Sequence, residues 1–267
     1  MVQYLAMREL AALWTDRDLL TSLARHELRR TYAGTAAGIA WAVLTPLVPL
    51  VIFTAVFSLG LRLPLGGAPY IYGFAAAYVP WVLISSAIGG AVGSIVDHRY
   101  LVKRVRFPIQ ILPAGPVLVQ SLPHVILVTL IAVACIAAGH GHFPELLLIL
   151  YFYLCAAVLI AGAGLVLSSL TVLVRDVQQA IPSFINVWFW ITPIAWASGA
   201  LPARGRMLLA LNPAAYIVSG YRFALMPKTF APPTSFDTII FWCIAIALLL
   251  SGSILFRRLR PHFWECL

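Results

Sequence analysis

The sequence predicts an all-α membrane protein with six transmembrane helices, a surface helix before the first span and a re-entrant element between the last two. Three observations support this. First, 62% of the 267 residues are hydrophobic and only 10% are charged, whereas soluble proteins are about half apolar and a quarter charged. Second, the chain contains long stretches without any charged residue. Third, most of the cations lie in short segments between those stretches.

The uncharged stretches set the number of spans. They are residues 31–61, 63–96, 107–144, 146–174, 177–203, 207–221 and 238–256. A spanning helix needs about 20 residues. Only 207–221 is clearly too short, and Pro213 interrupts it. We therefore predict six spans, with 207–221 as a re-entrant or interfacial element, which is tolerated at membrane depth only where it packs against protein or water.

The cations set the orientation. With six spans both termini share one side, together with residues 98–110 and 174–180. That side carries most of the 18 cations: Arg8, Arg17, Arg25, Arg29, Arg30, Arg99, Lys103, Arg104, Arg106, Arg175, Arg257, Arg258 and Arg260. The other side keeps Arg62, Arg204, Arg206, Arg222 and Lys228. Because cytoplasmic loops collect Lys and Arg, both termini are predicted to be cytoplasmic, and the net charge of +9 does not indicate a nucleic-acid partner.

Three regions follow from this topology: an N-terminal cytoplasmic or interfacial helix at 1–35, a six-span domain at 36–256 and a basic cytoplasmic tail at 257–267. The N-terminal helix is predicted to begin with a capping box, in which Thr15 is the N-cap and Asp18 the third helical residue. Its apolar and polar side chains separate onto two faces. The apolar face holds Leu20, Leu23, Ala24 and Leu28, and the polar face holds Ser22, Arg25, His26 and Arg29.

The segment after the second span is predicted to be a short amphipathic helix. At 100° per residue, Arg99, Lys103 and Arg106 fall within about 60° of each other, and Leu101 and Val105 lie opposite. Pro108 ends the element. Such a helix would lie along the membrane face with its cations toward lipid phosphate or a partner. The alternative is that these cations only anchor the cytoplasmic side of the spans.

Motifs for catalysis and cofactor binding are absent from the sequence. It has no Walker A pattern, HExxH pair, nucleophile elbow or glycine-rich dinucleotide fingerprint. The nine acidic residues are scattered, so we expect no catalytic, cofactor-binding or metal-binding residues. An ion-driven carrier usually keeps an acid in mid-membrane. Active transport by this chain would therefore draw its energy from another polypeptide.

Five stretches, taken in order, resemble the permease subunits of ABC-2 type exporters, and most closely those that export O-antigen, teichoic acid and capsule. They are HELRRTYAGTAAGIAWAVLTPL (26–47), YLVKRVRFPIQILP (100–113), VRDVQQAIPSFINVWFWITPIAW (174–196), LNPAAYIVSGYR (211–222) and LFRRLRPHFWECL (255–267). The chain departs from this pattern at His98, where Asn is frequent, and at Gln110, where an acid is frequent.

The resemblance implies a multi-pass protein of the bacterial inner membrane that pairs with a second copy of itself around a central conduit. Two copies of a separate ATPase subunit would dock underneath and bind ATP and Mg²⁺, while this chain would bind no cofactor. The cargo would be a polysaccharide, lipid-linked and moved across the membrane. Membrane lipids would be further partners.

The resemblance also implies site residues at the inner face. A coupling helix that enters a cleft of the ATPase would contain Arg99, Leu101, Lys103, Arg104, Val105, Arg106 and Phe107. The turn with Arg175 and Asp176 would lie at the same face, with Arg175 as a helix-end charge and Asp176 as the cap of the next helix. Arg29 and Arg30 would capture the pyrophosphate of the lipid carrier; the alternative is that they reach ordinary lipid head groups.

Spans one and five would line the conduit. Phe184, Trp188 and Phe189 in span five are the predicted cargo contacts, because flat rings with a polar rim suit sugar rings. The alternative is an aromatic belt at the membrane interface. Arg222 would either hold the re-entrant element by bonding helix-end carbonyls or face water.

Other functions stay open at this point. A permease of the same family for a small hydrophobic drug or lipid would have the same spans. A membrane-embedded enzyme that acts on lipid-linked sugars would need acids or a nucleophile clustered at one membrane face. A passive channel or an assembly scaffold would need neither the coupling helix nor the turn with Arg175 and Asp176 at the inner face.

Overall fold

The computed structural model describes residues 17–32, 35–60, 65, 69–102 and 107–266. Within these ranges the chain is helical and contains no β-strand, which agrees with the predicted all-α class. The α-helices are α2 (Arg17–Tyr32), α3 (Trp41–Thr54), α4 (Tyr70–Asp97), α5 (Arg99–Val102), α6 (Gly115–Ala137), α7 (Phe143–Leu146), α8 (Leu148–Leu173), α9 (Asp176–Ile191), α10 (Ala203–Leu209), α11 (Pro213–Leu225), α12 (Ser235–Leu259) and α13 (Phe263–Cys266). Shorter helical turns are η1 (Gly38–Ala40), η2 (Ala55–Gly60, a π-helix), η3 (Ile109–Ile111), η4 (Ser198–Ala200) and η5 (Arg260–His262).

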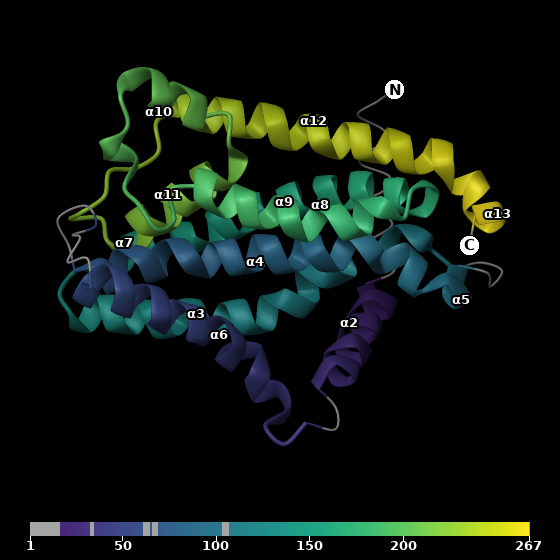
Figure 1. The fold of residues 1–267 in the computed structure, drawn as a ribbon, viewed down its shortest axis with the longest axis horizontal. Coiled ribbons are helices and arrows are strands. Elements are labelled where there is room, and N and C mark those ends of the chain that lie inside the picture. The colour runs from purple at the N-terminus through teal and green to yellow at the C-terminus, as the bar shows by residue number, and fades with distance from the viewer. Residues whose placement is uncertain (1–16, 33–34, 61–64, 66–68, 103–106, 267) are drawn as a thin grey trace.

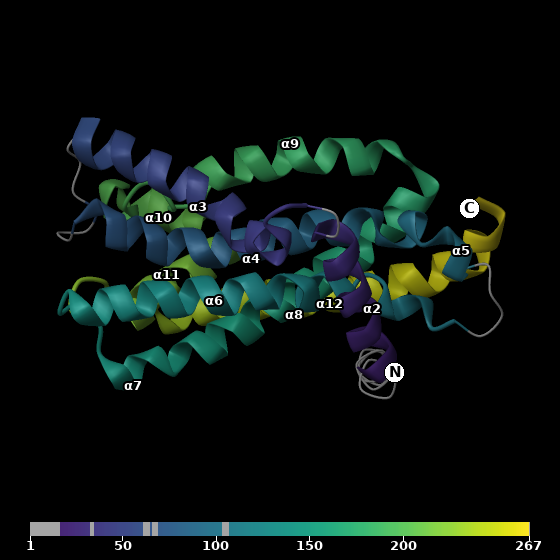
Figure 2. The same cartoon turned by 90° about the horizontal axis from the view of Figure 1, so that it is seen from below.

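The long helices run along one axis, as Figure 1 shows for α4, α6, α8, α9 and α12. The short elements gather at the two ends of this bundle: α5 and α13 at one end, and α7, α10 and α11 at the other. Helix α2 lies across the bundle axis in both views (Figures 1 and 2). The bundle therefore has one end that carries the predicted amphipathic segment and an opposite end that carries the predicted re-entrant element.

Five helical segments are long and apolar enough to cross a membrane: Trp41–Ser58, Tyr70–Asp97, Ile109–Ala137, Phe143–Leu173 and Ser235–His262. They correspond to five of the six predicted spans. The predicted fifth span, at 177–203, instead forms α9, which has 16 residues and is about 24 Å long. It ends where the backbone turns extended at Thr192, before Pro193. Since a bilayer core is about 30 Å thick, the sixth crossing stays a prediction.

Helix α4 forms the centre of the bundle. Two thirds of its most apolar stretch (67%) is buried, against 6% for Trp41–Ser58. The small side chains of Ala75, Ala76 and Ala77 are fully buried, so neighbouring helices approach closely on more than one side. Helices α6, α8 and α11 pack against α4 most extensively, and α3 and α9 pack against it less. Most of the large hydrophobic cluster of the protein is built around this helix.

Helices α8 and α12 form the most extensive pair, and glycines allow their close approach. A Cβ atom added at Gly162 would lie 2.8 Å from the backbone nitrogen of Leu249, and one added at Gly252 would lie 2.9 Å from the carbonyl oxygen of Gly162. Small residues are the usual means of bringing membrane helices together. The two backbones are therefore in contact at this point.

Helix α2 has the two faces that the sequence predicts. Leu20 and Ala24 are buried, whereas Ser22, Arg25 and His26 are exposed. The helix packs mainly on α6. The predicted cap at Thr15 lies outside the described residues. The amphipathic pattern thus docks α2 on the bundle through its apolar side.

The C-terminal segment is more than a basic tail. Helix α12 continues through Arg257 and Arg258 to Leu259, and the chain then turns so that Phe263 is fully buried. The rings of Phe263 and Phe256 meet edge to face, with centroids 5.5 Å apart. Both belong to a second hydrophobic cluster at the end of the bundle that carries α5. The end of the chain is therefore packed against that part of the protein.

Candidate functional site

The predicted coupling segment begins beside this second hydrophobic cluster. Arg99 is exposed, while Leu101 and Phe107 are half-buried and pack against the cluster. Four further predicted members, Lys103, Arg104, Val105 and Arg106, lie outside the described residues. The described helix α5 covers Arg99–Val102. The apolar side chains of the segment thus attach it to α8 and α12, and Arg99 faces outward.

The turn before α9 corrects one expectation. Arg175 already has helical backbone angles (φ −63°, ψ −23°) and occupies the N-cap position, where its side chain makes no capping hydrogen bond. Asp176 is therefore the first helical residue and not the cap, so the predicted cap was wrong. Its carboxylate lies in the first turn, where it still interacts favourably with the positive end of the helix dipole. Both side chains are exposed.

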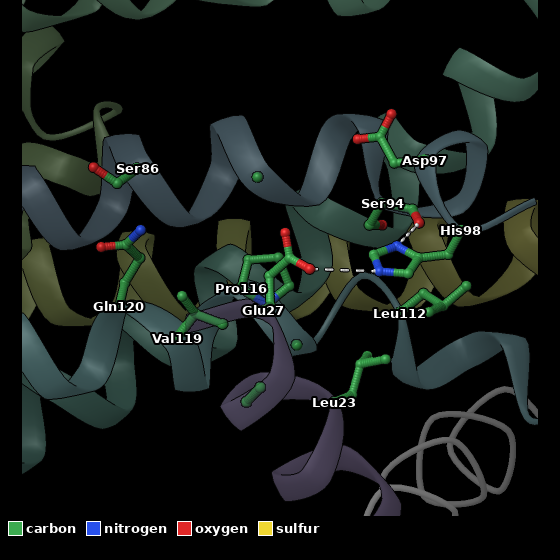
Figure 3. A pocket seen from close by; sticks show the side chains of 13 residues that line it. Leu23, Glu27, Ser86, Ser94, Asp97, His98, Leu112, Pro116, Val119 and Gln120 are labelled. Carbon is green, nitrogen blue, oxygen red and sulfur yellow. Dashed lines mark hydrogen bonds and ion pairs between the residues drawn. The ribbon is translucent and has the colours of Figure 1, made fainter. Parts of the chain in front are cut away.

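The end of α4 is tied to α2 through His98 and Glu27. His98 is the C-cap residue of α4. Its Nδ1 donates a hydrogen bond to the carbonyl oxygen of Ser94 (2.9 Å), and its Nε2 lies 3.8 Å from Oε2 of Glu27 (Figure 3). His98 immediately precedes α5. The surface helix and the end of α4, directly before the coupling segment, are thus joined by a side-chain contact that sequence reasoning did not find.

The predicted phosphate-binding arginines lie in the last turn of α2. Arg29 and Arg30 are both exposed. Nη1 of Arg30 lies 3.8 Å from Oε2 of Glu27, one turn earlier. An exposed pair of this length contributes little to stability. Both guanidinium groups therefore stay accessible to an anion, and their role stays a prediction.

The three predicted cargo contacts differ in exposure. Phe184 is 58% exposed, and its ring lies 5.9 Å from that of the half-buried Trp188. Phe189 packs inward against Phe53 (5.6 Å) and Trp81 (5.8 Å). Phe184 and Trp188 also line an apolar groove of about 510 Å³, whose walls are formed mainly by residues of α8, α9 and α12. Phe184 and Trp188 are accessible aromatic surface, whereas Phe189 mainly joins α9 to α3 and α4.

Asn212 connects the end of α9 to the start of α11. It is the N-cap of α11, and its Oδ1 accepts hydrogen bonds from the Ala214 backbone N–H (3.1 Å) and from Nε1 of Trp188 (2.8 Å). Its Nδ2 donates to Oγ1 of Thr192 (2.9 Å). Asn followed by Pro213 is a typical helix start, with the cap and the first helical residue in sequence. That pattern could have identified Asn212, and sequence reasoning missed it.

Arg222 holds the re-entrant region together from within. Its side chain is buried (3% exposed) and donates three short hydrogen bonds to backbone carbonyls. Nε donates to Gly73 (2.9 Å), Nη1 to Pro193 (2.6 Å) and Nη2 to Ile194 (2.7 Å). Arg222 therefore does not face water, and it bonds to backbone carbonyls as in the first predicted alternative, although these belong to α4 and to the turn after α9 and not to a helix end. Arg222 thereby joins α11, α4 and the turn after α9.

Comparison with known proteins supports the resemblance. Residues 18–226 match the family described as ABC-2 type transporter. The chain is similar to the O-antigen export system permease protein RfbA of Myxococcus xanthus, with 25% identity over 261 residues that cover 97% of this chain and 99% of the relative.

Two further relatives have related names. An O-antigen export system permease protein RfbA of Klebsiella pneumoniae is 24% identical over 254 residues, or 94% of this chain and 95% of the relative. The polysialic acid transport protein KpsM of Escherichia coli is 21% identical over 202 residues, or 75% of this chain and 78% of the relative. The similarity to the two RfbA proteins therefore extends over nearly the whole length of this chain and of each relative.

Proposed function

The chain belongs to the ABC-2 type transporter family, and from this membership we propose that it is the membrane-spanning permease subunit of an ATP-driven polysaccharide exporter. The observation that carries the proposal is the match, over nearly the full length of both proteins, to relatives named as O-antigen export permeases. A further relative is named for the transport of polysialic acid, which is also a polysaccharide. We propose that the cargo of this chain is lipid-linked, such as O-antigen, teichoic acid or a capsular glycan.

The chain is a multi-pass membrane protein, and we propose that it crosses the bacterial inner membrane six times with both termini in the cytoplasm. Helix α9 would supply the sixth crossing together with the residues that follow it. Helices α10 and α11 would form the re-entrant element on the outer side. The orientation of α2 across the bundle (Figures 1 and 2) and its two faces support a position in the plane of the inner membrane surface.

A second copy would pack against the edge formed by α3 and α9. The two helices lie at the same edge of the bundle (Figure 2), and Phe53 of α3 meets Phe189 and Trp190 of α9 (5.6 and 6.1 Å). Only 6% of Trp41–Ser58 is buried within one copy, which leaves this span available for a protein partner. A conduit between two such edges would present Phe184 and Trp188 to the sugar rings of the cargo.

The energy would come from a separate ATPase subunit, present in two copies, that binds ATP and Mg²⁺. It would dock at the end of the bundle that carries α5, with Arg99 and residues 103–106 toward an acidic surface. Leu101 and Phe107 would transmit its movement, because they pack against the cluster that joins α8 and α12. Rigid-body tilting of this segment would then widen or close the conduit.

Charge reversal in the coupling segment tests the proposal. The triple change of Lys103, Arg104 and Arg106 to Glu should reduce co-purification of the separate ABC ATPase subunit at least about tenfold, since each reversal replaces attraction by repulsion. Reversal of Arg204 and Arg206, which are exposed on α10 at the opposite end, is the matched control and should leave co-purification unchanged.

Export is measured in parallel as glycan at the cell surface. The proposal predicts its loss in the triple variant while the amount of permease in the membrane stays constant. Unchanged co-purification and unchanged export in the triple variant would contradict the coupling role. Export of a small hydrophobic compound in place of glycan would contradict the proposed cargo but not the family.

A further inference from the structure

A polar pocket of about 140 Å³ lies at the end of the bundle that carries α10 and α11 (Figure 1). Residues of η4, α10, α11 and α12 form its walls, so the pocket exists only where these four elements meet. Five of its lining residues are polar: Ser198, Arg206, Tyr216, Ser219 and Asp237. The volume is well above the roughly 15 Å³ that a single water molecule needs. The pocket therefore has room for a small polar ligand.

Three of these side chains keep hydrogen-bonding groups free. In the described part of the chain, the hydroxyls of Ser198 and Ser219 make no hydrogen bond. The guanidinium of Arg206 uses Nη1 to donate to the carbonyl oxygen of Leu201 (3.1 Å), and its Nε and Nη2 have no partner among the described residues. The hydroxyl of Tyr216 is already bonded within the bundle. Two hydroxyls and the remaining guanidinium donors are thus available to a ligand.

The two charged groups of the pocket do not neutralise each other. Arg206 and Asp237 both line it, yet within the described ranges they form no ion pair with each other. Oδ2 of Asp237 accepts hydrogen bonds from the backbone N–H (3.0 Å) and the hydroxyl (2.7 Å) of Thr234, which leaves Oδ1 as an acceptor. An anion would be repelled by Asp237 and a cation by Arg206. A neutral hydroxyl group suits both, since it donates to a carboxylate and accepts from a guanidinium.

The pocket shares one wall with the apolar groove that Trp188 lines. The segment 208–211, where α10 ends, separates the two: Leu208 and Leu211 line the groove, whereas Leu209 and Ala210 line the pocket. Neighbouring residues of one segment thus face a different site on each side. In the proposed topology α10 and α11 lie on the outer side of the membrane. A glycan that leaves the groove would therefore pass this segment and meet the pocket.

We propose that this pocket binds one sugar unit of the emerging glycan at the outer face of the membrane. One sugar hydroxyl donates to Oδ1 of Asp237, and others accept from Arg206 and from the two serine hydroxyls. The C–H surface of the ring lies against Leu209, in keeping with sites where a few polar groups orient a ligand on apolar walls. The choice of a sugar rests on the proposed function. A sugar held here keeps the chain beyond segment 208–211 while later units are still in the conduit.

Saturation-transfer NMR of the full-length chain tests the proposal, in a detergent without a sugar headgroup so that the detergent does not compete. The methyl glycosides of glucose, galactose, mannose and N-acetylglucosamine are titrated separately. Alanine is titrated as well, because a zwitterion is the other neutral ligand that two opposite charges would favour. We expect at least one of the four sugars to bind and alanine not to bind.

Arg206→Gln should weaken the binding of that sugar at least about tenfold, the ratio that one charge-assisted hydrogen bond supplies. Arg204→Gln is the matched control, since Arg204 lies on the same helix but does not line the pocket, and it should keep the affinity. Ser198→Phe fills the pocket from the half-buried turn η4 and should abolish binding. Binding of none of the four sugars, or of alanine in their place, overturns the proposal. So does a sugar affinity that Arg206→Gln or Ser198→Phe leaves unchanged.

Surface glycan in a strain that lacks this chain tests the proposed function separately. If surface glycan is lost but no sugar binds in the NMR titration, polysaccharide export stands and only the assignment of the pocket fails. If surface glycan is unchanged, the proposed export function fails, whatever the titration shows.

Discussion

Replacing Arg222 with Met removes a buried guanidinium while keeping a long side chain in its place. The guanidinium bonds to three carbonyls, of which Gly73 lies within α4, while Pro193 and Ile194 lie in the non-helical turn after α9. The two turn carbonyls would be left without this donor in the interior of the protein. An unsatisfied buried group costs about 1–3 kcal/mol, so the two together cost about 2–6 kcal/mol.

The cost is measured as the apparent free energy of unfolding of the full-length protein in mild detergent. Increasing fractions of SDS unfold the protein, and tryptophan fluorescence follows the transition. Arg222→Lys should fall between wild type and Arg222→Met, because an ammonium keeps the charge but cannot reach all three carbonyls as a planar fork does. Limited proteolysis of residues 192–202 gives a local readout, since that turn loses its anchor.

Arg206→Met is the matched control. Arg206 also donates to a carbonyl, that of Leu201 (3.1 Å), but it is exposed on α10, and surface substitutions usually change stability by less than about 0.5 kcal/mol. A loss below about 1 kcal/mol for Arg222→Met, or a loss equal to that of Arg206→Met, would refute the argument that Arg222 anchors the turn.

Two further predictions concern helix packing and the aromatic surface. Gly162→Ala should destabilise the protein by about 1–3 kcal/mol, because the new methyl group meets the backbone of Leu249 on α12. In the same SDS titration the control Gly89→Ala, which has open space around its Cβ, should be neutral or stabilising by up to about 1 kcal/mol. A larger loss of stability for Gly89→Ala than for Gly162→Ala would contradict the close packing of α8 on α12. Trp188→Phe loses the hydrogen bond to Asn212 at a cost of about 0.5–1.5 kcal/mol but keeps an aromatic ring, so glycan should still reach the cell surface. Trp188→Ala removes the ring and should reduce the amount of surface glycan. Equal export in the two variants would indicate that Trp188 has only a structural role.

Periodicity and charge were sufficient for elements whose environment is set by their own sequence. The separation of Leu20 and Ala24 from Ser22 and Arg25 on α2 follows from 3.6 residues per turn, and the structure confirms it. Five spans follow from uncharged length alone. Leu101 packs inward as its position opposite Arg99 predicts. In each case a single helix, with an apolar side that must be buried, specifies the outcome.

Local geometry limited two other predictions. Asp176 was expected to cap α9, but Arg175 occupies the N-cap position and Asp176 is the first helical residue. The predicted fifth span stops at Ile191 because the backbone turns extended at Thr192, before Pro193. The C-terminal end is not encoded in hydropathy, because apolar residues continue beyond it at 194–197. The length of α9 is thus set by the turn that follows it and not by its composition.

The amino-acid sequence alone identified this chain as a helical membrane protein, predicted its orientation and revealed its resemblance to a family. These properties depend on composition and on residues close together in the chain. Only the tertiary structure decided that Arg222 bonds to Gly73, 149 residues away, and that Glu27 faces His98. The physical reason is that a polar side chain among apolar helices must find its partners wherever packing brings them, and packing is a property of the whole bundle.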